Sequence, residues 1–327
     1  MLRSPMFRPS TRSASTALAA LFLAGMAPAG AVDRVTFGQV SPTATLWPGV
    51  VAARKGFFAA AGVEMDVVSI GVSPGQQAVA SGSLDIMHNA CNAIVAYIEQ
   101  GGTGAKLAMV SMAGHPAVLI GRKGLTDARE LKGKAIGTSS INSGSTILLK
   151  RLLKAKGLGE RDYDLVAGQG SAQIFQGLQA GALDAVWLVP PQSFTAAAAG
   201  YSVLGSFQDV APKFMFVCFA VNSAWLTAKA DVARRFAKAW LQGVGWLYEP
   251  ANRAEAERLL ADELKITPEI AAQSYDQLVV RNQAYPRDGK VDLDALRAVV
   301  DIMVEGKELA AMPQGDVRKY VDDRLLQ

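Results

Sequence analysis

The sequence has few of the residues that bind metals or form redox centres. Its 327 residues include two cysteines and two histidines, without the Cys/His spacing of a zinc or iron–sulfur site. We therefore expect no metal and no cofactor. Cys91 and Cys218 lie in apolar stretches. In an oxidising compartment they can pair, but a chain this long does not need a disulfide to fold, and we favour two separate buried thiols.

Long apolar runs are also scarce, and the one near the start is short. Arg3, Arg8 and Arg12 precede an apolar stretch, 17–27, which ends in Ala29-Gly30-Ala31. A basic head, a short apolar middle and small residues are typical of a secretory signal peptide. The stretch is about half the length that spans a bilayer, so a retained membrane anchor is the less favoured alternative. We predict a signal peptide over 1–31 and export of the remainder.

The excess of basic residues belongs mostly to this leader. Without its three arginines, the 33 basic residues fall to 30, against 29 acidic ones. A nucleic-acid-binding surface needs a clustered basic face, which this balance does not favour. No later segment reaches about 18 uninterrupted apolar residues, so we expect a soluble mature chain.

An internal repeat is the most informative feature that is present. Gly82-Ser83-Leu84-Asp85 returns 99 positions later as Gly181-Ala182-Leu183-Asp184. At the same offset Gly71 corresponds to Gly170, and Gln77 to Gln176. Both copies lie within the same order of expected strands and helices, which indicates two similar halves.

The pattern of apolar residues and of glycine and proline predicts these elements. The first half is expected to contain strands 35–40, 65–70 and 84–87 with helices 46–61 and 77–81. The second is expected to contain strands 134–138, 163–168 and 183–188 with helices 146–156 and 172–180. Beyond a strand at 214–221, we expect helices at 230–248, 253–263, from 267, at 292–305 and at 316–325.

Short apolar strands that alternate with helices indicate parallel sheets covered on both faces. We therefore predict an α/β protein of two doubly wound lobes. The first is discontinuous, 32–119 with 214–327, and the second is 120–213. Two connecting strands, near 118–122 and 210–216, are expected to act as hinges. In such sheets ligands bind beyond the carboxyl ends of the strands.

Four stretches resemble a known family, namely KGFFAAAGVEMDVV (55–68), QQAVASGSLDI (76–86), LKGKAIGT (131–138) and GLQAGALDAVWLVPP (177–191). They are similar to the nitrate/sulfonate/taurine-type substrate-binding proteins of ABC importers, in the superfamily that includes thiamine-pyrimidine-synthase-like proteins. The resemblance spans about 35–310. It implies a class II periplasmic-binding-protein fold with a two-strand hinge, a periplasmic location, a monomer and delivery of a small molecule to a membrane permease.

Six loops follow the carboxyl ends of the expected strands, and none contains Lys, Arg, Asp or Glu. They offer hydroxyls, amides, two indoles and one histidine, so a small monoanion or near-neutral molecule fits better than a dianion. A sulfonate, a carboxylate or a heterocycle is the expected ligand. The candidate binding residues are Ser41, Thr43, Thr45, Trp47, Ser73, Gln76, His88, Asn89, Ser139, Ser143, Gly144, Ser145, Thr146, Gln169, Ser171 and Trp187.

Each candidate has a structural alternative. Ser143 or Ser145 can cap a helix without touching a ligand, and Trp47 and Trp187 can pack in a core. His88 can be a structural histidine. The function also has alternatives, because the same fold serves sensory binding proteins and enzymes. These loops hold one histidine and Cys91 but no obvious acid–base pair or nucleophile, which disfavours catalysis.

Overall fold

The strands of the chain form two five-stranded sheets. The computed structural model describes residues 32–327 except 139–140, 142, 169–170 and 213, so the predicted leader lies outside the described residues. The first sheet has the order β2-β1-β3-β10-β4 and the second the order β7-β6-β8-β5-β9. In the first sheet the strands are β1 (Asp33–Gln39), β2 (Val63–Ser69), β3 (Ile86–Ala90), β4 (Ala105–Ala113) and β10 (Met215–Asn222). In the second they are β5 (Val118–Gly121), β6 (Lys134–Thr138), β7 (Tyr163–Ala167), β8 (Ala185–Leu188) and β9 (Ser202–Ser206).

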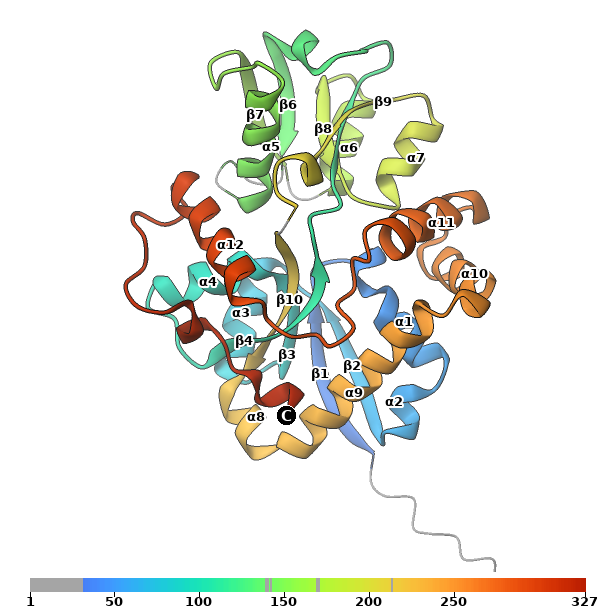
Figure 1. Ribbon diagram of the computed structural model, residues 1–327, viewed down its shortest axis with the longest axis vertical. Coiled ribbons are helices and arrows are strands. Elements are labelled where there is room, and N and C mark those ends of the chain that lie inside the picture. Colours follow the sequence, from blue (N-terminus) through green and yellow to red (C-terminus); the bar gives the residue numbers. More distant parts are fainter. Residues whose placement is uncertain (1–31, 139–140, 142, 169–170, 213) are drawn as a thin grey trace, which may run out of the picture. The chain divides into compact units, whose positions relative to one another are not determined.

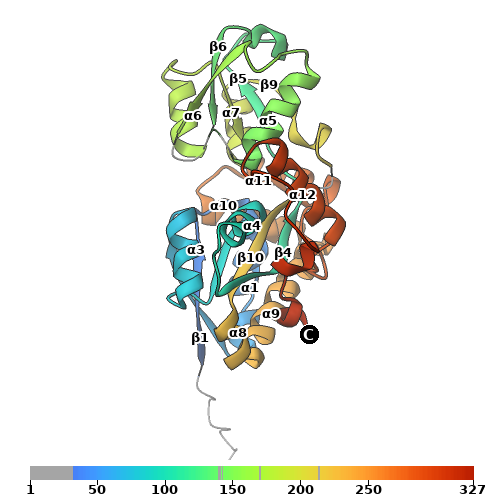
Figure 2. The same ribbon diagram turned by 90° about the vertical axis from the view of Figure 1, so that its left-hand side faces the viewer.

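Helices cover both sheets, and we call each sheet with its helices a lobe (Figures 1 and 2). Before the chain enters the second sheet it forms α1 (Trp47–Arg54), α2 (Phe57–Ala60), α3 (Val72–Ser81) and α4 (Cys91–Glu99). Between the strands of the second sheet lie α5 (Gly144–Ala155), α6 (Ser171–Gln179) and α7 (Gln192–Ala198). After β10 come α8 (Ser223–Ala228), α9 (Ala230–Leu247), α10 (Arg253–Leu264), α11 (Pro268–Tyr275) and α12 (Leu293–Glu305). In the described part of the chain, no helix is long and apolar enough to cross a membrane.

The two sheets share one plan, as the repeat predicts. β1 pairs in parallel with β2 and β3, and β6 pairs in parallel with β7 and β8. The strand on the far side of β3, β10, is antiparallel to it, and β5 is antiparallel to β8 in the same way. The α/β architecture of two doubly wound lobes is therefore confirmed.

The repeated Gly-x-Leu-Asp motif has a structural role. Asp85 accepts a hydrogen bond from the backbone N–H of Thr36 at 2.8 Å, and Asp184 accepts one from Ala135 at 3.0 Å. Thr36 and Ala135 are themselves 99 positions apart. In each lobe the aspartate just before one parallel strand (β3 or β8) is thus hydrogen-bonded to the neighbouring parallel strand (β1 or β6). The most visible sequence repeat is explained by strand attachment rather than by binding chemistry.

Three predicted helices differ from the observed ones. The helix expected at 46–61 is divided into α1 and α2, because Gly56 adopts a left-handed φ of 74°. α3 begins at Val72 rather than at 77, with Pro74 in its first turn, where a proline costs no hydrogen bond. The helix expected at 316–325 is instead two 3-10 turns, capped by Asp316 and Asp322.

The favoured prediction of two free cysteines is wrong. Cys91 and Cys218 form a disulfide, with their Cα atoms 5.1 Å apart. β10 pairs with β3 so that Cys218 lies opposite Asn89, and Cys91 begins the helix that follows β3. This register brings together two thiols separated by 127 positions.

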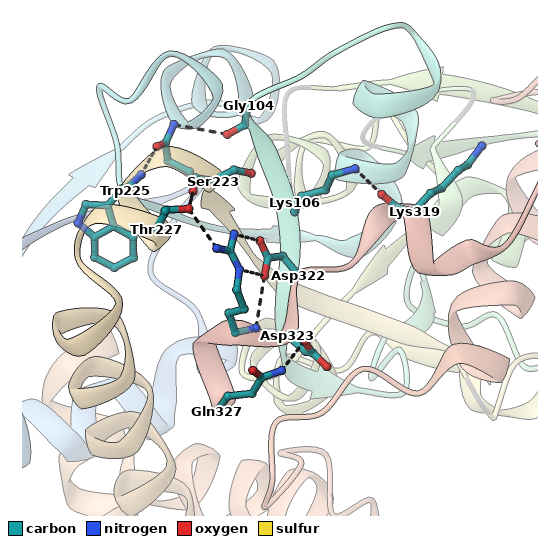
Figure 3. A network of polar contacts seen from close by, with 11 residues as sticks. Gly104, Lys106, Ser223, Trp225, Thr227, Lys319, Asp322, Asp323 and Gln327 are labelled. Atoms are coloured by element: carbon teal, nitrogen blue, oxygen red, sulfur yellow. Dashed lines mark hydrogen bonds and ion pairs between the residues drawn. The ribbon is translucent and has the colours of Figure 1, made fainter.

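The C-terminal tail covers the outer edge of the first sheet at β4. Asp322 donates its backbone N–H to the carbonyl of Leu107 at 2.8 Å, and Lys106 donates to the carbonyl of Lys319. Arg324 bonds Asp322 and reaches the hydroxyl of Thr227 in α8 at 3.1 Å (Figure 3). An edge strand that is paired in this way offers less surface for aggregation.

Candidate functional site

The carboxyl ends of β6 and β8 bring several predicted site residues together. Ser143 caps α5 and accepts a hydrogen bond from the backbone N–H of Thr146 at 3.4 Å. Thr146 is fully buried and bonds the hydroxyl of Thr138 at the end of β6. The indole N–H of Trp187 donates to the same Thr138 hydroxyl at 3.2 Å. Ser143 therefore caps α5, as the sequence predicts.

Ser145 is connected to this group by His115, which lies between β4 and β5 in the chain. Its hydroxyl is 2.8 Å from Nε2 of His115, and His115 meets the edge of the Trp187 ring at a centroid distance of 5.7 Å. His115 is fully buried, and this burial lowers its pKa to about 3. The ring is therefore neutral at physiological pH, so the group offers hydroxyls and aromatic surface but no positive charge.

In the first lobe, Gln76 and Asn89 lie on one face of the sheet. A Cβ on Gly75 would meet the Met87 sulfur at 2.8 Å, which places α3 against the Met87 side of β3. Asn89 is two residues after Met87 and therefore shares its face. Both amides are more than nine-tenths buried, and Nε2 of Gln76 and Nδ2 of Asn89 have no hydrogen-bond partner within the described residues. An unpaired buried amide N–H costs free energy unless water or a ligand accepts from it.

His88 lies on the opposite face and does not join these amides. Its ring is 5.9 Å from that of Trp240 and 5.4 Å from that of Phe219, and Nε2 lies 2.8 Å from the Ser111 hydroxyl. Burial lowers the pKa of His88 to about 3. Its neighbours are those of a structural histidine in an aromatic core.

The candidate binding residues in the loop after β1 and at the start of α1 lie partly at the surface and partly in the core. Ser41 is exposed, and Thr43 caps the short turn Ala44–Leu46 with its hydroxyl 2.7 Å from that of Thr45. Trp47 is fully buried, and its indole N–H donates to the carbonyl of Ala256 in α10 at 3.1 Å. Trp47 therefore attaches α1 to α10 and is not brought to the other candidates.

The remaining candidates lie at helix starts or outside the described residues. Ser73 is exposed in the first turn of α3, and Ser171 is the half-buried first residue of α6. Ser139 and Gln169 belong to the residues that the structure does not describe.

Sequence reasoning missed a carboxylate that lies between the lobes. Glu308, after α12, accepts hydrogen bonds from Nδ2 of Asn92 in α4 at 3.2 Å and from the backbone N–H of Gly144 in α5. Burial raises the pKa of this carboxyl to about 7, although both hydrogen bonds act in the opposite direction. The six loops after the predicted strands contain no charged residue. Glu308 was not considered because it follows a helix, α12, rather than a strand.

A pocket of about 370 Å³ opens beside the end of β1. Its walls include Thr43, Val50, Met65 and Leu264, and it contains no residue of the second sheet or its helices. It therefore lies within the first lobe and is distinct from the predicted position between the lobes. Among the residues described, no three or more His, Cys, Asp and Glu side chains are grouped so as to hold a metal ion.

Solved structures share the fold at low sequence identity. The nitrate-binding protein NrtA of Synechocystis has a TM-score of 0.74 at 15% identity, covering 90% of this chain and 87% of its own. The alkanesulfonate-binding protein SsuA of Xanthomonas axonopodis, bound to MOPS, has a TM-score of 0.70 at 17% identity, covering 88% and 98%. The desulfurization enzyme DSZB has a TM-score of 0.65 at 17% identity, covering 90% and 97%.

These likenesses show the periplasmic-binding-protein fold, and at such identities they show the fold alone. No curated protein matches the chain. The NMT1/THI5-like family matches residues 44–254, a stretch that runs from the turn before α1 to the start of α10 and includes both sheets apart from β1. The chain therefore belongs to the NMT1/THI5-like family.

Proposed function

We propose that this protein is the exported solute-binding component of an ABC importer. It binds one small molecule between its lobes, closes around it and delivers it unchanged to a permease in the inner membrane. The proposed lobes are 32–119 with 214–327 and 120–213, except that Val118 and Leu119 belong to β5 and pair within the second sheet. Residues 1–31 are proposed to direct export. The neighbours that bind nitrate and alkanesulfonate on the same fold support this role.

The observation that carries the proposal is the pair of unpartnered amides at the carboxyl end of the first sheet. Gln76 and Asn89 each keep a buried amide nitrogen without an acceptor among the described residues. Ligands bind beyond the carboxyl ends of the strands in such sheets. A solute with hydrogen-bond acceptors would satisfy both groups, while Ser145 and Trp187 line the corresponding end of the second sheet.

The proposed solute is a small organic monoanion or a near-neutral molecule, such as a sulfonate, a carboxylate or a heterocycle. The predicted loops carry no charged side chain, and the two buried histidines are neutral because burial lowers the pKa of each to about 3. A dianion would therefore lose its hydration without gaining a counter-charge.

A thermal-shift screen of residues 32–327 tests this proposal. Sulfonates, nitrate, carboxylates, amides and heterocycles are added singly, since a ligand that binds the folded state raises the melting temperature by mass action. We expect one saturable hit, recovered chemically unchanged, whose affinity falls at least tenfold in Gln76→Ala or Asn89→Ala. Gln77→Ala, at the exposed glutamine next to Gln76 in α3, is the matched control. A screen without any hit contradicts the proposal.

The second candidate function is catalysis, which the desulfurization enzyme on the same fold favours. The same screen decides between the two, because a compound that is converted during incubation indicates an enzyme. A sensory role uses the same binding and closure, and differs only in whether the closed form contacts a receptor or a permease.

A further inference from the structure

Glu308 lies at a meeting point of two helix N-termini. Asn92 is the second residue of α4, and Gly144 is the first residue of α5. The two helices touch here, because a Cβ added to Gly144 would lie 3.2 Å from Nδ2 of Asn92. Both residues donate hydrogen bonds to the Glu308 carboxylate. Each helix also directs the positive end of its dipole to this point.

The segment that carries Glu308 is seated firmly on α5. Glu305, at the end of α12, pairs with Nε of Arg151 in α5 at 2.9 Å. A Cβ on Gly306 would lie 2.0 Å from Cδ1 of Ile147, so the backbone itself packs against α5. Glu308 is therefore held in place by the chain on either side of it and not only by its own two hydrogen bonds.

Within the described part of the chain, no cationic side chain pairs with this carboxylate. Its pKa is raised first by burial and lowered only by the Asn92 side chain and the Gly144 backbone, without a contribution from a cation. Arg151 in α5 pairs with Glu305 instead. His115, which bonds Ser145 in the same helix turn, is neutral because burial lowers its pKa to about 3.

We infer that Glu308 determines the charge of the solute, because its carboxylate occupies the anion-binding position between α4 and α5. Binding between the lobes then disfavours anionic solutes and favours an uncharged one that carries an N–H or O–H donor. This inference rests on the proposed function and narrows its solute class to the near-neutral side. A second anion beside a partly desolvated carboxylate is repelled strongly enough to weaken binding by roughly 100-fold.

The occupancy of this position can be tested without knowing the solute. Removing the side chain in Glu308→Ala leaves a gap at the two helix N-termini that formate, the smallest carboxylate, can fill. We expect formate to raise the melting temperature of this variant saturably at pH 8, against sodium chloride at equal ionic strength. The unsubstituted chain and Glu308→Gln, in which the position stays filled, should respond by less than about 1 °C.

Two further variants separate charge from loosened packing. Glu305→Gln weakens the Arg151 pair of the same segment and should show no response to formate. In a binding assay with acetate and acetamide, Glu308→Gln should gain at least tenfold in affinity for acetate relative to acetamide. Because it uses Glu308→Gln, this second assay tests the inference even if Glu308→Ala does not fold.

The inference is overturned if formate stabilises Glu308→Ala no more than the unsubstituted chain, or if Glu305→Gln gains the same response. It is equally overturned if the acetate preference of Glu308→Gln is unchanged. A formate response together with an empty solute screen would contradict the proposed function but retain Glu308 as the occupant of an anion-binding position. The two failures are therefore distinguishable.

Discussion

Burial of the Glu308 carboxylate between neutral partners determines how this residue responds to pH. Its pKa in the folded chain, about 7, lies above its ordinary value of 4.5. The folded state therefore binds the proton more tightly than the unfolded state, and stability contributed by the protonated carboxyl is lost as the pH rises from about 4.5 through 7.

We predict that stability falls by about 2 kcal/mol between pH 5 and pH 8 relative to Glu308→Gln, allowing for partial solvent screening. Urea unfolding of both proteins at the two pH values measures this difference. Asn92 and the Gly144 backbone do not titrate, so they add nothing to it. Parallel pH profiles in the two proteins would show that the Glu308 pKa is not raised.

The contacts of Trp47 and Glu308 could not be predicted from the sequence, for one physical reason. Trp47 was correctly expected after a strand end, but its contact with Ala256 is 209 positions away in the chain. The Glu308 contact with Asn92 spans 216 positions. A loop's composition reveals which groups are available, whereas the face that each group occupies depends on packing between distant segments.

Among the secondary-structure elements, α1 and α9 approach closely at two glycines, Gly49 in α1 and Gly243 in α9, and only Gly243 faces backbone. A Cβ on Gly243 would lie 2.2 Å from the Pro48 carbonyl oxygen and 3.1 Å from Cβ of Ala52. Because the first contact is with backbone, it cannot be relieved by a rotamer change, and the two helices must separate.

We predict that Gly243→Ala destabilises the protein by about 2 kcal/mol, as overpacked cores do. Gly245 lies in the same helix with nothing within 4 Å of its added Cβ, which makes Gly245→Ala a matched control. That change should be neutral or stabilising by up to about 1 kcal/mol, because alanine favours a helix interior. Urea unfolding compares the two variants, and equal effects would contradict the helix contact.

The disulfide joins the start of α4 to β10 across 127 positions. We predict that the chain, unfolded without reductant, shows no reactive thiol, and that reduction lowers stability by about 2–5 kcal/mol. Thiol titration and urea unfolding with and without reductant measure both effects. The double variant Cys91→Ser, Cys218→Ser should be insensitive to reductant. Two thiols that titrate in the unreduced chain would exclude the bond.

Local patterns predicted elements well where one segment determines its own structure. Strand β6 and helix α9 were expected within a residue of their observed bounds, because alternating or helical apolar spacing is a local property. The pairing of β3 with β10 joins distant segments and could not be predicted from local patterns. The disulfide depends on this pairing, so it was not predicted either. The offset of 99 residues was the exception, since a repeat carries long-range information in the sequence itself.

For the whole molecule, the proposed function requires that a solute bind between two lobes and change their separation. Gln77 and Gln176 are exposed, equivalent positions in α3 and α6, one in each lobe. Cysteines introduced there can carry spin labels, because the native cysteines are paired. A second pair at Gln77 and Lys238, both exposed and both in the first lobe, is the control.

The most direct measurement is the distance distribution between each pair of labels, with and without a saturating solute from the screen. We predict that the distances between the labels at 77 and 176 become shorter on binding, as in hinge closure, while those of the control pair do not change. A solute that saturates the protein and leaves both distributions unchanged would contradict binding between the lobes.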